Sequence, residues 1–122
     1  MPKLLIVDDE SDVREFARNF FRKRGIDVFV ASDGAAALDI VSAESPELVL
    51  LDVRMEAMNG LEMLRELRRS HNQTRVIMVS STEDDRVVEE VKALGVLGFI
   101  HKPLILDELE KIVLAELGNV TC

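Results

Sequence analysis

Five short apolar runs, separated by segments with helical periodicity, constrain the fold of this sequence more than any other feature. Four of the runs are near-continuous rather than alternating and are rich in β-branched residues or Leu, which is typical of strands buried on both faces of a parallel sheet. They lie at residues 4–7, 28–31, 48–51, 76–79 and 97–100. We therefore predict five strands.

The segments between the runs carry apolar residues at the three-and-four spacing of one helix face. The clearest of them is followed by Lys23, Arg24 and Gly25, a typical helix end. The stripes are Val13, Phe16, Ala17, Phe20 and Phe21; Ala37, Leu38 and Val41; Leu61, Leu64 and Leu67; Val87, Val88, Val91 and Leu94; and Leu109, Ile112, Val113 and Leu117. This alternation of strand and helix predicts a doubly wound α/β fold with a parallel sheet covered by helices on both faces.

Length and composition set the class of protein. A chain of 122 residues with 48% hydrophobic content suits one domain, residues 1–122. A net charge of −8 disfavours direct binding to nucleic acid or to an anionic membrane. The only cysteine is Cys122, and no apolar stretch approaches the roughly 20 residues of a membrane span. A chain without an intrachain disulfide suits the reducing cytoplasm, where we expect it.

Polar residues follow four of the five runs. Asp8 and Asp9 follow the first, Asp52 the third, Ser80 the fourth and Lys102 the fifth. In a parallel sheet these positions emerge at the carboxyl edge, where open α/β sheets bind ligands. Taken singly, each acid or Ser80 could be a cap or turn former, and Lys102 a solvated charge. Their joint placement favours one shared site.

The residue types at this edge match a particular chemistry. Carboxylates brought together repel one another, so a cation is expected among them, and Mg²⁺ prefers oxygen ligands. One carboxylate would remain as a nucleophile, with a lysine and a hydroxyl to bind the oxygens of a transferred phosphoryl group. The set could form an acyl phosphate.

The motifs carry a family resemblance. They are Ile6-Val7-Asp8-Asp9-Glu10, Leu50-Leu51-Asp52-Val53-Arg54-Met55 with Gly60 after it, Val79-Ser80-Ser81 and Lys102-Pro103. Over about residues 3–117 the sequence resembles the receiver domain of two-component response regulators. The resemblance implies a flavodoxin-like sheet of five strands in the order 2-1-3-4-5 with five helices.

The resemblance also implies roles for the acids. Asp52 would accept a phosphoryl group from a phosphohistidine on a sensor histidine kinase or a phosphotransfer protein. Mg²⁺ would be held by Asp9, Asp52 and the backbone carbonyl of Arg54, with Asp8 acting through bound water.

Four further residues receive roles from the resemblance. Ser80 and Lys102 would contact the phosphoryl group, and Ser80 and Phe99 would switch together, although Phe99 also fits a plain core residue. Pro103 is a candidate for a cis peptide bond. The surface of the last two strand–helix units would then change, to control a downstream partner or a missing effector domain, or to form a phosphorylation-dependent homodimer.

The loop after Asp52 departs from the family pattern. Glu56 stands where the family usually has proline, and it is either a solvated acid or a residue that pairs with Arg54 or Lys102 or raises the demand for metal. By resemblance, Arg54 and Thr82 flank the path of the hydrolytic water. They are candidates for tuning the lifetime of the phosphoryl group.

Three functions compete at this point. The first is a signalling switch that is not an enzyme, with at most slow self-dephosphorylation. The second is a degenerate receiver that acts as a constitutive interaction module. The third is an Asp-nucleophile, Mg²⁺-dependent phosphatase of the haloacid dehalogenase type, which would need a second acid where Arg54 stands.

Overall fold

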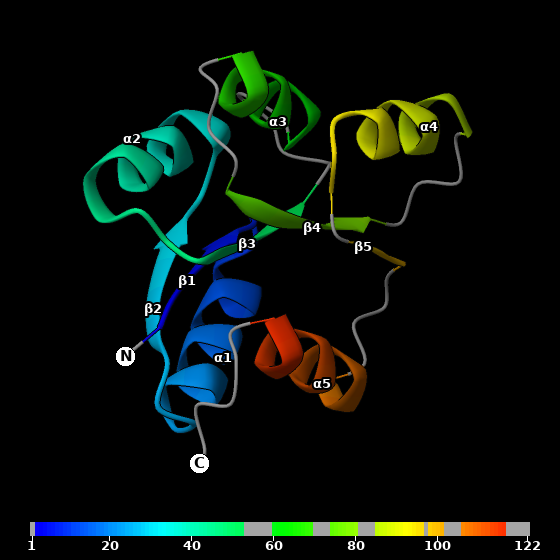
Figure 1. Ribbon diagram of the computed structural model, residues 1–122. Helices are drawn as coiled ribbons and strands as arrows, with labels where there is room; N and C mark the ends of the chain where they lie inside the picture. The colour runs from blue at the N-terminus through cyan, green and yellow to red at the C-terminus, as the bar shows by residue number, and fades with distance from the viewer. Residues whose placement is uncertain are drawn as a thin grey trace.

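A computed structural model describes residues 2–52, 60–69, 74–80, 85–96, 98–101 and 106–116. Strand and helix alternate five times along the chain (Figure 1). No helix within these ranges is long and apolar enough to cross a bilayer. The elements are β1 Lys3–Val7, α1 Ser11–Arg22, β2 Asp27–Ala31, α2 Gly34–Glu44, β3 Leu48–Asp52, α3 Gly60–Arg69, β4 Arg75–Ser80, α4 Asp85–Ala93, β5 Gly98–His101 and α5 Leu106–Glu116.

The described strands form one parallel sheet in the order β2-β1-β3-β4-β5. This is the order that the family resemblance implied. Leu4 of β1 lies opposite both Val28 of β2 and Leu48 of β3. The chain runs to one side of β1 first and then to the other, so the carboxyl ends of β1 and β3 flank the point where the order reverses. Open sheets bind ligands at such a point.

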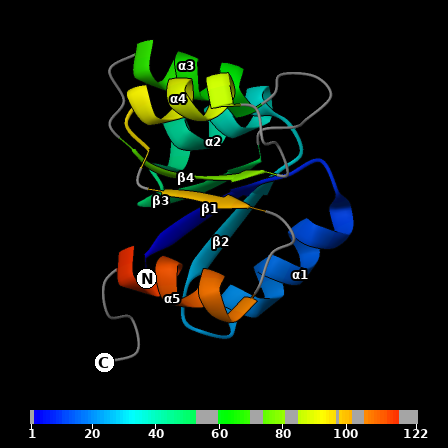
Figure 2. The same ribbon diagram turned by 90° about the vertical axis from the view of Figure 1, so that its right-hand side faces the viewer.

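Two apolar layers enclose the sheet, because successive side chains of a strand point to opposite faces. Leu5, Val7, Val49 and Leu51 pack with α2, α3 and α4 on one face. On the other face, strand residues such as Ile6 pack with α1 and α5 (Figure 2). Each fully buried Leu or Val contributes roughly 1.5–3 kcal/mol to folding. Burial on both faces explains why the strands read as continuous apolar runs, and the predicted α/β class is confirmed.

Three details differ from the sequence prediction. Asp52 and Ser80 are the last residues of β3 and β4 rather than the first residues after them. The predicted apolar faces of α1 and α5 were too wide, since Phe16 is 58% exposed and Ile112 is 37% exposed. The buried side of α1 is centred on Ala17 and Phe21, and Phe16 lies roughly 100° away around the helix. Phe16 therefore lies outside the buried side of α1.

Candidate functional site

Two buried carboxylates lie at the carboxyl ends of neighbouring strands. Asp8 follows β1 directly and is 4% exposed, and Asp52 ends β3 and is 3% exposed. Both line one cavity, whose other walls are apolar side chains of the sheet, α1 and α5: Ile6, Val7, Val13, Ala17, Leu50, Val79 and Leu109. Burying carboxylates in such surroundings is costly unless charge or hydrogen bonds compensate. The sheet thus places acidic side chains where a purely structural domain would place apolar groups.

The carboxylate cluster continues toward solvent. Asp9 and Glu10 are exposed, and one carboxylate oxygen from each of Asp8, Asp9 and Glu10 lies within 4.8 Å of the others. We call Asp8, Asp9, Glu10 and Asp52 the acidic edge. The atoms that it offers to a metal are all oxygens, and Mg²⁺ binds through one or two carboxylates with water completing its coordination shell. The residues therefore fit a hard divalent cation.

Hydrogen bonds fix the turn that carries this cluster. The Asp8 N–H donates to the carbonyl of Ala31 over 3.1 Å and so extends the pairing of β1 with β2 by one step. The Asp8 Oδ1 accepts the N–H of Glu10 at 2.9 Å, and Arg14 Nη1 donates to the Asp8 carbonyl at 2.8 Å. The backbone and side chain of Asp8 are thus both held by neighbours.

Two members of this arrangement were missed from the sequence. Glu10 follows the two aspartates directly, and its adjacency was the available signal. Arg14 stands four residues after Glu10, which is one helical turn on, once the start of α1 at Ser11 is known. Glu10 is the N-cap residue just before α1 and Arg14 lies near the start of this amphipathic helix, where a solvated role is the ordinary interpretation of a polar residue.

The other predicted site residues are placed only in part. The backbone of Ser80 ends β4 opposite His101, and that of Phe99 lies in β5 opposite Met78. Their side chains lie outside what the structure describes. So do five residues in full: Arg54, Glu56, Thr82, Lys102 and Pro103. The described geometry thus brings Asp8 together with Asp52 in one cavity, and Asp8 together with Asp9 in one cluster.

The fold and the acidic edge define a class: α/β proteins that gather acids at the switch point of an open parallel sheet. Comparison with known proteins narrows it. A family model for the response regulator receiver domain matches residues 4–114. The chain belongs to this family. Receiver domains of response regulators are signalling switches and generally not enzymes.

Individual relatives agree. Sporulation initiation phosphotransferase F of Bacillus subtilis is 38% identical over 91% of this chain and 90% of its own length. The regulatory protein AtoC of Escherichia coli is 34% identical, and the match covers 91% of this chain and 24% of that longer protein. A solved structure of the response regulator TrrA from Thermotoga maritima, in complex with Mg²⁺-BeF, is 27% identical with a TM-score of 0.83, covering 96% of this chain and 100% of that one.

Proposed function

We propose that this chain is a phosphorylation-dependent switch of a two-component system and that Asp52 is its phosphoacceptor. The observation that carries the proposal is the pair of buried acids, Asp8 and Asp52, in one cavity at the carboxyl ends of β1 and β3. A carboxylate oxygen of Asp52 would attack the phosphorus of a phosphohistidine, so that the P–N bond breaks and an acyl phosphate forms. Residues 1–122 would form one receiver domain.

The proposal also assigns residues to the metal site. Asp8, Asp9 and Asp52 would hold Mg²⁺ together with the backbone carbonyl of Arg54, and the ion would supply positive charge beside the transferred phosphoryl oxygens. Ser80 and Lys102 would donate to the same oxygens, while Ser80 and Phe99 would couple the site to the switch. The clustered oxygens of Asp8, Asp9 and Glu10 support this assignment.

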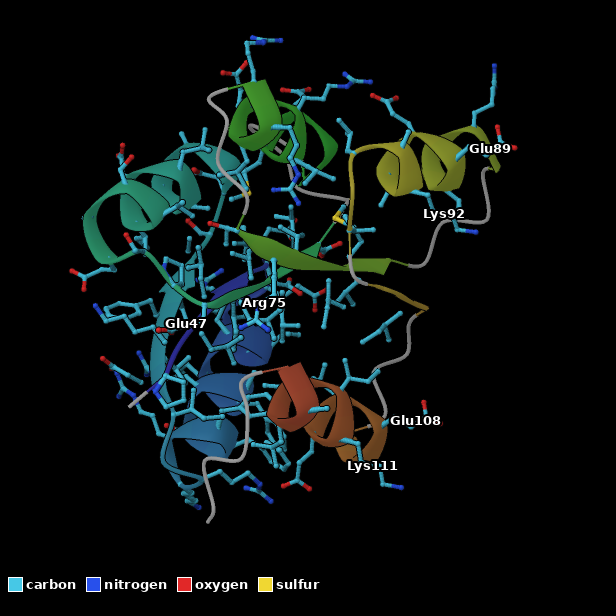
Figure 3. The ribbon with its side chains drawn as sticks, viewed as in Figure 1. Glu47, Arg75, Glu89, Lys92, Glu108 and Lys111 are labelled. Carbon is cyan, nitrogen blue, oxygen red and sulfur yellow. The ribbon has the colours of Figure 1, made fainter. Side chains whose placement is uncertain are left out.

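We further propose that the output surface lies on α4, β5 and α5. Exposed side chains of opposite charge stand three residues apart on both helices, Glu89 and Lys92 on α4 and Glu108 and Lys111 on α5, pointing outward (Figure 3). Such a mixed surface suits polar contact with a downstream protein, an effector domain or a second copy of the chain. The input partner would be a sensor histidine kinase or a phosphotransfer protein.

The test is phosphorylation of the purified chain by acetyl phosphate with Mg²⁺, read as intact mass. We expect the native chain to gain the mass of one phosphoryl group, and Asp52→Asn to gain none. Asp12→Asn, which changes an exposed acid at the start of α1, is the matched control and should behave as the native chain does. Phosphorylation that persists in Asp52→Asn would disprove the assignment, and a native chain that is never phosphorylated would favour the degenerate interaction module.

A further inference from the structure

An arginine beside the acidic edge donates a hydrogen bond to a backbone carbonyl. Arg14 is half-buried on α1, and its Nη1 donates to the carbonyl of Asp8 at 2.8 Å. A guanidinium beside several acids could instead have formed a fork with a carboxylate, the geometry that suits both groups best. Its contact with a carbonyl therefore places the donor on the peptide that joins Asp8 to Asp9.

From this geometry we infer that Arg14 is a positioning residue for the metal site, an inference that rests on the proposed function. The peptide between Asp8 and Asp9 sets the position of the Asp9 backbone, from which the exposed Asp9 carboxylate extends. Arg14 binds the carbonyl of that peptide. The Asp8 Oδ1, which accepts from the Glu10 N–H at 2.9 Å, holds the other side of the same turn. Residues in this supporting position orient the groups that bind a metal directly.

The sign of the effect separates positioning from simple electrostatics. Removing a positive charge near a cation site should tighten Mg²⁺ binding, because one source of repulsion is lost. Loss of positioning should weaken it, because the carboxylates must then be ordered when the ion binds. The two explanations predict changes in opposite directions.

The experiment measures the Mg²⁺ dissociation constant of the full chain by titration calorimetry at fixed ionic strength. Arg14→Met keeps an unbranched apolar stem but removes the donors, and we expect binding about 10-fold weaker, the lower end of the usual effect of such supporting residues. Arg14→Lys keeps one charged donor, and its Mg²⁺ dissociation constant should lie between those of the native chain and Arg14→Met. Arg22→Met, at the exposed end of α1, makes the same change in net charge far from Asp8 along the helix and should leave binding unchanged or slightly tighter.

A second readout is independent of the metal. The Glu10 amide should exchange with solvent faster in Arg14→Met than in the native chain when Mg²⁺ is absent, as measured by NMR, because the turn around Asp8 opens more often. Mg²⁺ binding that is unchanged or tighter in Arg14→Met, or Glu10 exchange at the native rate, overturns the inference. A native chain that fails to bind Mg²⁺ overturns the proposed metal site, while Glu10 exchange still decides whether Arg14 orders the turn.

Discussion

The acidic edge and the contact between α3 and α4 use charged residues in opposite ways. We call Arg65, Arg68 and Glu90 the α3–α4 junction. There each described charge has a specific partner, since Arg65 Nε and Nη2 reach the two carboxylate oxygens of Glu90 at 2.5 and 2.8 Å. At the acidic edge, three carboxylates share a space of 4.8 Å, and the arginine beside them binds a carbonyl. One region pairs its charges and the other accumulates a single sign.

The junction also supports the end of a helix. Arg68 donates to the carbonyls of Leu94 and Gly95 just after α4, at 2.7 and 3.2 Å, and to that of Thr74 just before β4, at 3.0 Å. A cation at this end satisfies carbonyls that have no partner within the helix and opposes the helix dipole. Partial burial lowers the pKa of the Arg68 guanidinium from its usual value, but the group stays charged at neutral pH.

The difference indicates where the molecule has given up stability for function. Paired charges leave little for an added ion to gain, whereas acids gathered in one place repel one another, and a cation among them would relieve that repulsion. We therefore expect ions and charge-neutralising substitutions to stabilise the acidic edge. Substitutions that remove a charge from the junction should destabilise it.

The largest expected effect is stabilisation by Mg²⁺. A ligand that binds only the folded state, present at 100 times its dissociation constant, adds about 2.7 kcal/mol to the free energy of unfolding. We expect a gain of this size in urea denaturation, and its loss in Asp9→Asn. NaCl at the same ionic strength serves as the control. An equal gain with NaCl would mean that the acids are merely screened and that the contrast with the junction is wrong.

Next in size is the loss of Arg68. In Arg68→Ala the carbonyls of Leu94, Gly95 and Thr74 lose a charged donor, so we expect the free energy of unfolding to fall by about 1.5 kcal/mol. Arg69→Ala is the matched control, because the exposed Arg69 pairs with Glu66 within α3 and should cost under about 0.5 kcal/mol. Equal losses in the two variants would show that the junction does not depend on its bridging contacts.

Neutralising Asp52 should have a smaller effect of opposite sign. Asp52→Asn keeps the shape of the side chain but removes an acid that lies in the same cavity as Asp8. Without Mg²⁺ we expect the relief of their repulsion to exceed the loss of the contacts that Asp52 makes, with a gain of about 1 kcal/mol. Urea denaturation in EDTA measures it, with the exposed Asp12→Asn as control. A loss of stability would mean that the contacts of Asp52 inside the protein outweigh its repulsion by Asp8.

Much of this contrast could be predicted from the sequence, but not all. Runs such as 48–51 predicted strands correctly because burial on both faces leaves no polar position, and Asp8 and Asp52 stood out because they end such runs. The partners of Arg68 could not be predicted, since they are backbone carbonyls, which have no sequence signature, and those of Leu94 and Gly95 are 26 and 27 residues away. Arg14 was missed for the same reason. Phe16 was assigned to the apolar face of α1 but is exposed. The spacing of apolar residues shows that a helix has an apolar face, but not which residues lie at the centre of that face.

The last prediction concerns the pH dependence of the Arg65–Glu90 pair, the smallest effect. The hydrogen bond from Arg65 lowers the pKa of the Glu90 carboxyl below its ordinary value of 4.5, and the bond to Glu90 raises the pKa of Arg65, which stays charged throughout. A lowered carboxyl pKa means that the pair stabilises the fold above about pH 4.5 and that this contribution disappears as the pH falls through the folded-state value.

The urea midpoint of Glu90→Gln should therefore lie below that of the native chain at pH 7, and the two midpoints should converge in acid. Glu89→Gln, the neighbouring exposed acid on α4 (Figure 3), should show a smaller difference at pH 7. A gap between native and Glu90→Gln that persists or widens in acid would mean that Glu90 acts by packing rather than as a charge.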